Sequence, residues 1–204
     1  MQSDLSNRGS TLNIIEPDLL LAAYSAGYFP MADSRHGQIR WYSPDPRAII
    51  PLDSFKISRS LRQTMKKNLF DVRLNASFED VMRRCAERED TWISEEIVQS
   101  YRELHRLGNA HSVESWREGR LVGGLYGVTL GAAFFGESMF SIERDASKVA
   151  LVSLVERLRK NDFELLDTQF ITAHLAGFGA IEIPRKNYLL LLKKAAARQR
   201  SFIN

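Results

Sequence analysis

The sequence contains one cysteine, Cys85, and no long run of apolar residues. A single cysteine cannot form an internal disulfide or a multi-cysteine zinc site, so both kinds of framework are excluded. The apolar segments fall well short of the roughly 20 residues that cross a bilayer. Residues 19–23 are also too few for the core of a signal peptide. These absences favour a protein of the reduced cytoplasm that has no membrane partner.

Familiar nucleotide and metal motifs are missing as well. No GxxxxGK segment followed by Ser or Thr is present, which argues against a phosphate-binding P-loop. The glycine-rich stretch 123–127 does not match the dinucleotide pattern GxGxxG, and 136–140 lacks the closing glycine of the hydrolase motif GxSxG. The histidines show no spacing typical of metal ligands. They are His36, His105, His111 and His174. We therefore expect no metal site.

The composition is that of an ordinary folded protein. Of its 204 residues, 44% are hydrophobic and 26% are charged, which excludes a disordered or collagen-like chain. The length suits one large domain, or one domain with a small companion. The 28 basic and 25 acidic residues leave a net charge of +3, which permits a polyanionic partner without requiring one.

The order of the predicted elements indicates the α+β class. A short helix from Pro17 to Gly27 precedes a loop-like stretch, 28–55, that holds four of the six prolines and the pair Trp41-Tyr42. Helical spacing of apolar residues then predicts helices, and alternation with turn residues predicts antiparallel strands. The predicted ranges are helices 58–68, 77–86 and 94–108, strands 112–117, 121–128 and 132–135, helix 145–158, strand 163–170 and helix 188–200.

Two acidic residues and two basic clusters are the candidate functional groups. Asp167 lies in the apolar strand segment 165–170, where a carboxylate is unfavourable unless it is paired. Glu137 lies at a glycine-rich strand end. One basic cluster ends the chain, and the other falls on a predicted helix and consists of Arg59, Arg62, Lys66 and Lys67. Such clusters are either solvated faces or nucleic-acid contacts, and charge alone leaves both open. The residues by themselves indicate an α+β enzyme with a site of acids and amides.

Nine short segments carry a more specific signal than any single motif. They are GYFP at 27–30, WYSPDPR at 41–47, TWI at 91–93, AHSVE at 110–114, LVGGLYG at 121–127, GESMFS at 136–141, ASK at 146–148, LDTQ at 166–169 and FGA at 178–180. In this order, over about residues 20–191, they resemble the leucyl/phenylalanyl-tRNA–protein transferase family.

The resemblance implies an enzyme that transfers leucine or phenylalanine, and methionine less well, from aminoacyl-tRNA to proteins beginning with Lys or Arg. The added residue would mark the acceptor for degradation by the N-end rule in the bacterial cytoplasm. A small N-terminal domain, 1–52, is implied, followed by a catalytic domain, 53–204, similar to GCN5-related N-acetyltransferases with a mostly antiparallel central sheet. No cofactor is implied, and the expected state is a monomer.

The matching positions also imply a catalytic group, a pocket and a tRNA surface. Glu137 and Gln169 would orient the amine and the ester, while Asp167 either positions Gln169 or acts as a general base. The implied pocket for the donor side chain consists of Leu125, Phe134, Met139, Leu151, Leu154 and Leu166. Periodicity alone favours ordinary core for these six residues. The expected tRNA contacts are Trp41, Trp92, Arg59, Arg62, Lys66 and Lys67.

One position departs from the family pattern. Met31 follows Phe29-Pro30 where many members have a tryptophan that stacks on the terminal adenosine. A methionine can lie against a base through its sulfur, but it loses part of the ~1–3 kcal/mol that aromatic stacking contributes per base. Trp41 or Trp92 is therefore expected to compensate.

Two other functions fit parts of the sequence. A coenzyme A-dependent N-acetyltransferase would share the implied fold, but it needs the pyrophosphate-binding pattern Arg/Gln-x-x-Gly-x-Gly/Ala, which this chain lacks. A non-catalytic RNA-binding module would use the basic clusters. It would give no role to Glu137, Asp167 and Gln169, and its binding should survive their mutation.

Overall fold

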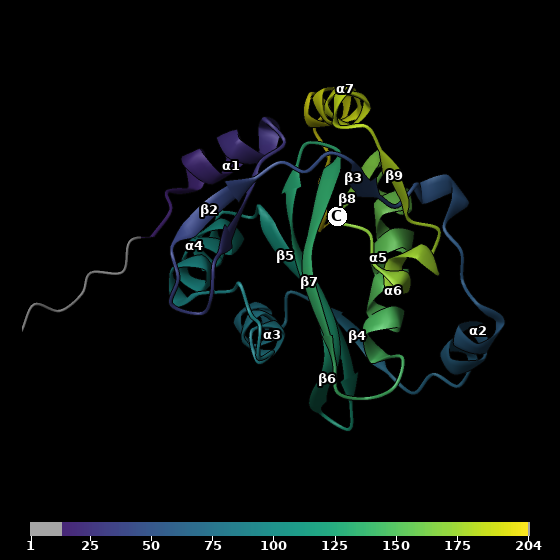
Figure 1. Ribbon diagram of the computed structural model, residues 1–204. Helices are drawn as coiled ribbons and strands as arrows, with labels where there is room; N and C mark the ends of the chain where they lie inside the picture. Colours follow the sequence, from purple (N-terminus) through teal and green to yellow (C-terminus); the bar gives the residue numbers. More distant parts are fainter. Residues whose placement is uncertain (1–13, 204) are drawn as a thin grey trace, which may run out of the picture.

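The computed structural model describes residues 14–203, which form a seven-stranded sheet with helices on both faces and a separate two-stranded hairpin (Figure 1). The order of strands in the large sheet is β4-β5-β6-β7-β8-β3-β9. Neighbouring strands are antiparallel except β7 and β8, which are parallel. The mostly antiparallel α+β architecture expected from the sequence is therefore confirmed.

The elements have the following bounds. The strands are β1 (Phe29–Ala32), β2 (Ile39–Tyr42), β3 (Arg47–Ile49), β4 (Asp71–Leu74), β5 (Ala110–Arg117), β6 (Arg120–Leu130), β7 (Ala133–Ser141), β8 (Leu165–Gln169) and β9 (Ile181–Ile183). The helices are α1 (Pro17–Ser25), α2 (Arg59–Lys66), α3 (Phe78–Cys85), α4 (Glu95–Arg106), α5 (Ala146–Lys160), α6 (Ala173–Ala176) and α7 (Arg185–Ala196), with a 3-10 turn at Leu52–Ser54.

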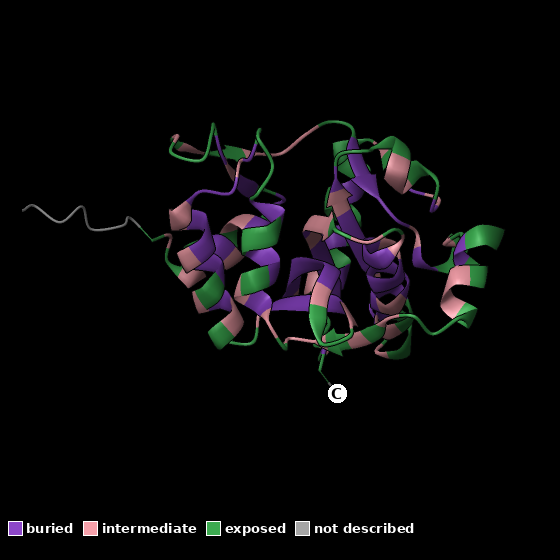
Figure 2. Ribbon diagram, turned by 90° about the horizontal axis from the view of Figure 1, so that it is seen from below, coloured by how far each residue is buried: buried purple, intermediate pink, exposed green. Residues whose placement is uncertain are grey.

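The sheet separates two apolar cores. On one face, α1, α3, α4 and α7 cover a core that includes Tyr24, Tyr101 and Tyr126. On the other face, α5 covers a core that includes Leu125 and Phe134. Figure 2 shows the buried residues on the sheet and on the helix sides that face it, with exposed residues outside. Within residues 14–203, no helix is long and apolar enough to cross a membrane.

Local sequence signals account for several helix ends. The Ser58 hydroxyl accepts a hydrogen bond from the Leu61 N–H at the start of α2, and Ser94 does the same for Ile97 in α4. Such caps satisfy an N–H that the first helical turn leaves without a partner. Gly27 follows α1 with a φ of +81°, a left-handed conformation that glycine adopts without strain. The predicted stop of this helix is confirmed.

The shortest strands differ from the sequence prediction. The proline-rich stretch 28–55 is not a structureless loop, because it holds the β1–β2 hairpin and the three-residue strand β3. Pro30 has no N–H to donate. It is compatible with this strand because β1 pairs only with β2 and its other edge has no strand that needs an N–H donor. β7 extends to Ser141, well beyond the predicted end at 135, because Gly136 interrupts the apolar alternation without ending the strand.

β3 connects the early part of the chain to the large sheet. It lies within the expected N-terminal unit, 1–52, yet it pairs with β8 on one side and β9 on the other. The first 13 residues of that unit lie outside the described residues. β3 thus places a segment of the N-terminal half beside the strand that carries Asp167 and Gln169.

Candidate active site

A cleft of about 780 Å³ opens where β7 and β8 separate. The two parallel strands pair only from Ala133 with Leu165 to Phe135 with Asp167. Beyond this point β7 continues beside β6, and the cleft lies between Gly136–Phe140 on one side and Thr168–Phe170 on the other. Residues from both faces of the sheet line the cleft.

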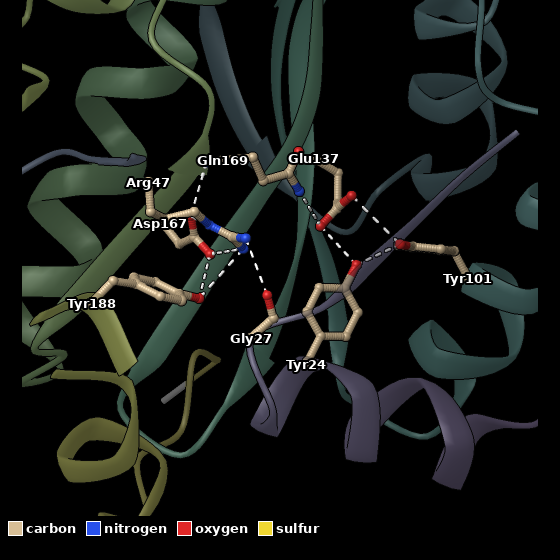
Figure 3. Close-up of polar contacts among 8 residues, drawn as sticks. All are labelled: Tyr24, Gly27, Arg47, Tyr101, Glu137, Asp167, Gln169 and Tyr188. Carbon is tan, nitrogen blue, oxygen red and sulfur yellow. Dashed lines mark hydrogen bonds and ion pairs between the residues drawn. The ribbon is translucent and has the colours of Figure 1, made fainter. Parts of the chain in front are cut away.

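Glu137 lies at this separation because of an irregularity in β7. Gly136 pairs with Gly127 and Ser138 pairs with Tyr126, so Glu137 has no partner on β6. An extra residue of this kind redirects its side chain out of the regular alternation. The carboxylate accepts hydrogen bonds from Tyr24 Oη at 2.7 Å, Gln169 Nε2 at 2.9 Å and Tyr101 Oη at 3.4 Å (Figure 3).

Burial dominates the electrostatics of Glu137. Loss of water raises the pKa of this carboxyl to about 7, although the hydrogen bonds from Tyr24 and Gln169 lower it. Burial and the Glu137 charge also raise the pKa of the Tyr24 and Tyr101 hydroxyls, so both remain protonated donors. Near neutral pH, Glu137 can therefore both accept and release a proton.

Asp167 has a different environment, although it is only one strand away. It forms two hydrogen bonds with the buried Arg47 guanidinium, at 2.6 and 2.9 Å, and accepts a third from Tyr188 Oη at 2.7 Å (Figure 3). Arg47 also donates to the Gly27 carbonyl and lies between the rings of Phe29 and Tyr188. Asp167 is thus a fully paired carboxylate, and it does not line the cleft.

Gln169 connects the two carboxylates. Its backbone N–H donates to Asp167 Oδ1 at 2.8 Å, and its side-chain Nε2 donates to Glu137. The residue has a φ of +65°, which is unfavourable for a side chain other than glycine and persists only when neighbouring contacts hold it. The amide Oε1 has no hydrogen-bond partner among the described residues and is available to a substrate in the cleft.

Comparison with known proteins decides the family. Residues 49–193 match the model of leucyl/phenylalanyl-tRNA protein transferase, and residues 13–45 match that of its N-terminal domain. The chain belongs to this family. The transferase of Herpetosiphon aurantiacus is 57% identical over 89% of this chain and 94% of its own length. The transferase of Chlorobaculum parvum is 53% identical over 93% of this chain and 100% of its own length.

Solved structures with a similar shape are distant. L-PGS from Bacillus licheniformis has a TM-score of 0.42 and 15% identity over 80% of this chain and 56% of that chain. This similarity is too weak to support an argument about function.

Most of the pocket residues that the family resemblance implies do line the cleft. Met139 lies on the β7 side, and the others come from β6, β8 and α5. They are Leu125, Leu151, Leu154 and Leu166. Phe134 is different, because it is wholly buried, packs against Phe202 and does not line the cleft.

The expected tRNA contacts are distributed over the surface. Trp92 and Met31 line the cleft mouth, whereas Trp41 lies on the hairpin opposite Pro30 and is 39% exposed. The basic cluster of α2 is exposed, and none of its side chains forms an ion pair with another described residue. Its members are Arg59, Arg62, Lys66 and Lys67.

Sequence reasoning missed the residues that hold the carboxylates. Tyr24, Tyr101 and Tyr188 lie on three different helices, and only the fold brings their hydroxyls to Glu137 and Asp167. For Arg47 the sequence held one signal. Asp167, an acid inside an apolar strand, requires a partner, and Arg47 lies within the matched WYSPDPR segment. Among residues 14–203, no group of His, Cys, Asp and Glu could hold a metal ion.

Proposed function

We propose that this protein transfers leucine or phenylalanine, and methionine less readily, from aminoacyl-tRNA to the α-amine of proteins that begin with Lys or Arg. Such a transfer marks the acceptor for degradation by the N-end rule. The observation that carries the proposal is the cleft of a family member, in which the Glu137–Gln169 pair adjoins an apolar recess. The bacterial cytoplasm, where aminoacyl-tRNA is available, is the proposed location.

The two faces of the separated strands suggest how the substrates are arranged. The α5 side of the cleft is apolar, with Leu151, Leu154 and Leu166, and suits the side chain of the donor amino acid. The opposite side carries Glu137 and Gln169 and suits the acceptor amine. The ester that joins donor and tRNA then lies in the gap between β7 and β8.

The reaction is an aminolysis of an activated ester. The acceptor nitrogen forms a bond to the donor carbonyl carbon, the bond from that carbon to the ribose oxygen breaks, and the ribose oxygen receives a proton. The amine must first lose its own proton, and an α-amine has an ordinary pKa of about 8. Holding the two groups in position supplies much of the rate, since effective molarities of ~10⁵ M or more are reached when reacting groups are well oriented.

Glu137 is the proposed proton acceptor. A pKa of about 7 leaves much of this carboxyl ionised near neutral pH, close to the pKa of the amine that it serves. Gln169 Oε1 is the proposed hydrogen-bond acceptor for the same amine. Asp167 is assigned a positioning role, because its oxygens already accept four hydrogen bonds, from Arg47, Tyr188 and the Gln169 backbone.

The tRNA and the fold complete the proposal. The exposed basic side chains of α2 would contact the phosphate backbone, and Trp92 beside Met31 would contact the terminal adenosine. The separation of two parallel strands around the substrate supports a catalytic unit similar to GCN5-related N-acetyltransferases, formed by residues 53–204 together with β3 from the expected N-terminal unit, 1–52. The protein would act as a monomer without a cofactor.

A transfer assay tests this function. Radiolabelled leucyl-tRNA is incubated with acceptors that are identical except for a first residue of Arg, Lys or Ala. Label should move to the Arg and Lys acceptors and not to the Ala acceptor. Equal transfer to all three would contradict the proposed acceptor specificity. Acetylation of the same peptides from acetyl-coenzyme A, without transfer from leucyl-tRNA, would favour an N-acetyltransferase instead.

A further inference from the structure

The connection between α3 and α4 places Arg88 at the mouth of the cleft. Its Nη2 atom donates to Ser138 Oγ at 2.9 Å and to the Met139 carbonyl at 2.5 Å. Both acceptors lie on β7 directly after Glu137. Arg88 forms no ion pair with a described residue, whereas its neighbour Glu87 pairs with Arg84. The Arg88 guanidinium thus occupies a set of neutral acceptors beside the proposed catalytic carboxylate.

Tyr126 contributes another unpaired group at the same place. It is the cross-strand partner of Ser138, is wholly buried and lines the cleft. Its hydroxyl has no hydrogen-bond partner among residues 14–203. Burial, followed by the Glu137 charge, raises the pKa of this hydroxyl and the Arg88 charge lowers it, so both charged groups lie near it. A buried hydroxyl without a protein partner is unfavourable, and it can hydrogen-bond to a ligand in the cleft.

We propose that this set of acceptors binds the cationic side chain of the acceptor protein's first residue, and that Arg88 is an internal substitute for that side chain. The set, here called the cation recess, consists of Ser138 Oγ, the Met139 carbonyl and the Tyr126 hydroxyl. The inference rests on the proposed function, because it starts from an acceptor amine held by Glu137 and Gln169.

The spacing along β7 supports this assignment. A regular strand advances about 3.3 Å per residue and the irregularity at Glu137 shortens this rise, so the Met139 carbonyl lies at most about 7 Å along the strand from the Glu137 backbone. That span is comparable to an extended lysine or arginine side chain. A substrate whose amine lies at Glu137 can therefore place its own cation where the Arg88 guanidinium now lies. A short or neutral first residue cannot displace Arg88 from Ser138 Oγ and the Met139 carbonyl, so it would gain no contact in the recess.

Removal of Arg88 tests the inference. Acceptor binding must displace this guanidinium, and competition of that kind weakens the apparent affinity. Arg88→Ala should therefore lower the KM for an Arg-initiated peptide by about fivefold or more and strengthen inhibition by free argininamide, with the KM for leucyl-tRNA unchanged. Arg106→Ala is the matched control. It removes the same charge outside the cleft, from a side chain that pairs with Glu103, so the acceptor KM should not change.

The alternatives give different results. An unchanged or raised acceptor KM in Arg88→Ala would show that Arg88 is only a structural contact and would overturn the inference. A raised KM for leucyl-tRNA with a smaller salt dependence would assign Arg88 to tRNA phosphate instead. If Arg88→Ala does not fold, as judged by circular dichroism, the same comparison is made with Arg88→Gln. Absence of transfer by the wild-type protein would contradict the proposed function itself, which is a separate result.

Discussion

Glu137 is a carboxyl group whose hydrogen bonds do not offset its loss of water, and this property links stability to activity. Its pKa of about 7 exceeds the ~4.3 of a glutamate in an unfolded chain. Between these two values the native state binds more protons than the unfolded state. The free energy of unfolding contributed by this group therefore falls as the pH rises from about 4 to about 7, and stays constant above that.

Glu137→Gln should separate the two effects. The amide keeps an acceptor oxygen for Tyr24 and Gln169 but does not titrate, so stability should vary less between about pH 4 and 7. Turnover should fall ~10²-fold or more, because the proton acceptor is removed. Urea unfolding at several pH values and single-turnover transfer measure these effects. Glu143→Gln is the control, because Glu143 lies outside the cleft and pairs with Arg117; its turnover should not change. Near-normal turnover in Glu137→Gln would remove Glu137 from the chemistry.

Asp167→Asn is expected to affect folding more than its small change in shape suggests. The substitution leaves buried Arg47 without a full charge partner and directs an amide N–H at one of its former donors. Breaking a buried ion pair from one side costs about 3–5 kcal/mol. Asp33→Asn breaks the exposed pair with Arg40 and should cost about 0–1 kcal/mol. Urea unfolding compares the two variants. Similar small decreases in stability would show that Asp167 does not hold Arg47 as described.

At the scale of elements, regular apolar periodicity was sufficient to predict the long helices, β5 and β6, but only the first residues of β7. The serine caps and Gly27 identified several ends because each residue satisfies a local geometric need. Strands of three or four residues, such as β3 and β9, are too short to show a period and are defined only by their neighbours in the sheet. The separation of β7 from β8 is equally non-local. Glu137 and Gln169 were therefore predictable as candidates, but their contacts with Tyr24 and Tyr101 were not.

Helix α2 allows a test of the tRNA surface. The proposed phosphate contacts come from its basic side chains and the following lysine, which are Arg59, Arg62, Lys66 and Lys67. Replacing all four by alanine should weaken tRNA binding and flatten the slope of log affinity against log salt by up to ~0.9 for each phosphate that is no longer bound. Filter binding at several salt concentrations measures the slope. Arg102→Ala with Arg106→Ala removes basic groups that already pair with Glu79 and Glu103, and should leave the slope unchanged. Unaltered affinity in the α2 variant at low salt would identify α2 as a solvated face.

At the scale of the whole molecule, β3 makes the two halves of the chain depend on each other. It lies between β8 and β9, and its Arg47 reaches both Asp167 and the Gly27 carbonyl at the end of α1. Without β3, Asp167 would be a buried carboxylate with only hydroxyl and amide partners, and the edge of β8 would be open. The catalytic strand therefore requires a segment that the expected division at residue 52 assigns to the N-terminal unit.

Two truncations test this dependence. A fragment of residues 46–204 keeps β3 and the Arg47–Asp167 pair, whereas a fragment of residues 53–204 lacks both. Removing one partner of a buried ion pair costs about 3–5 kcal/mol, a large share of the stability of an ordinary domain. We expect the longer fragment to unfold cooperatively in urea and the shorter one to show no cooperative transition, with the full chain as the reference. Equal unfolding midpoints for the two fragments would show that the sheet from β4 to β8 folds without β3.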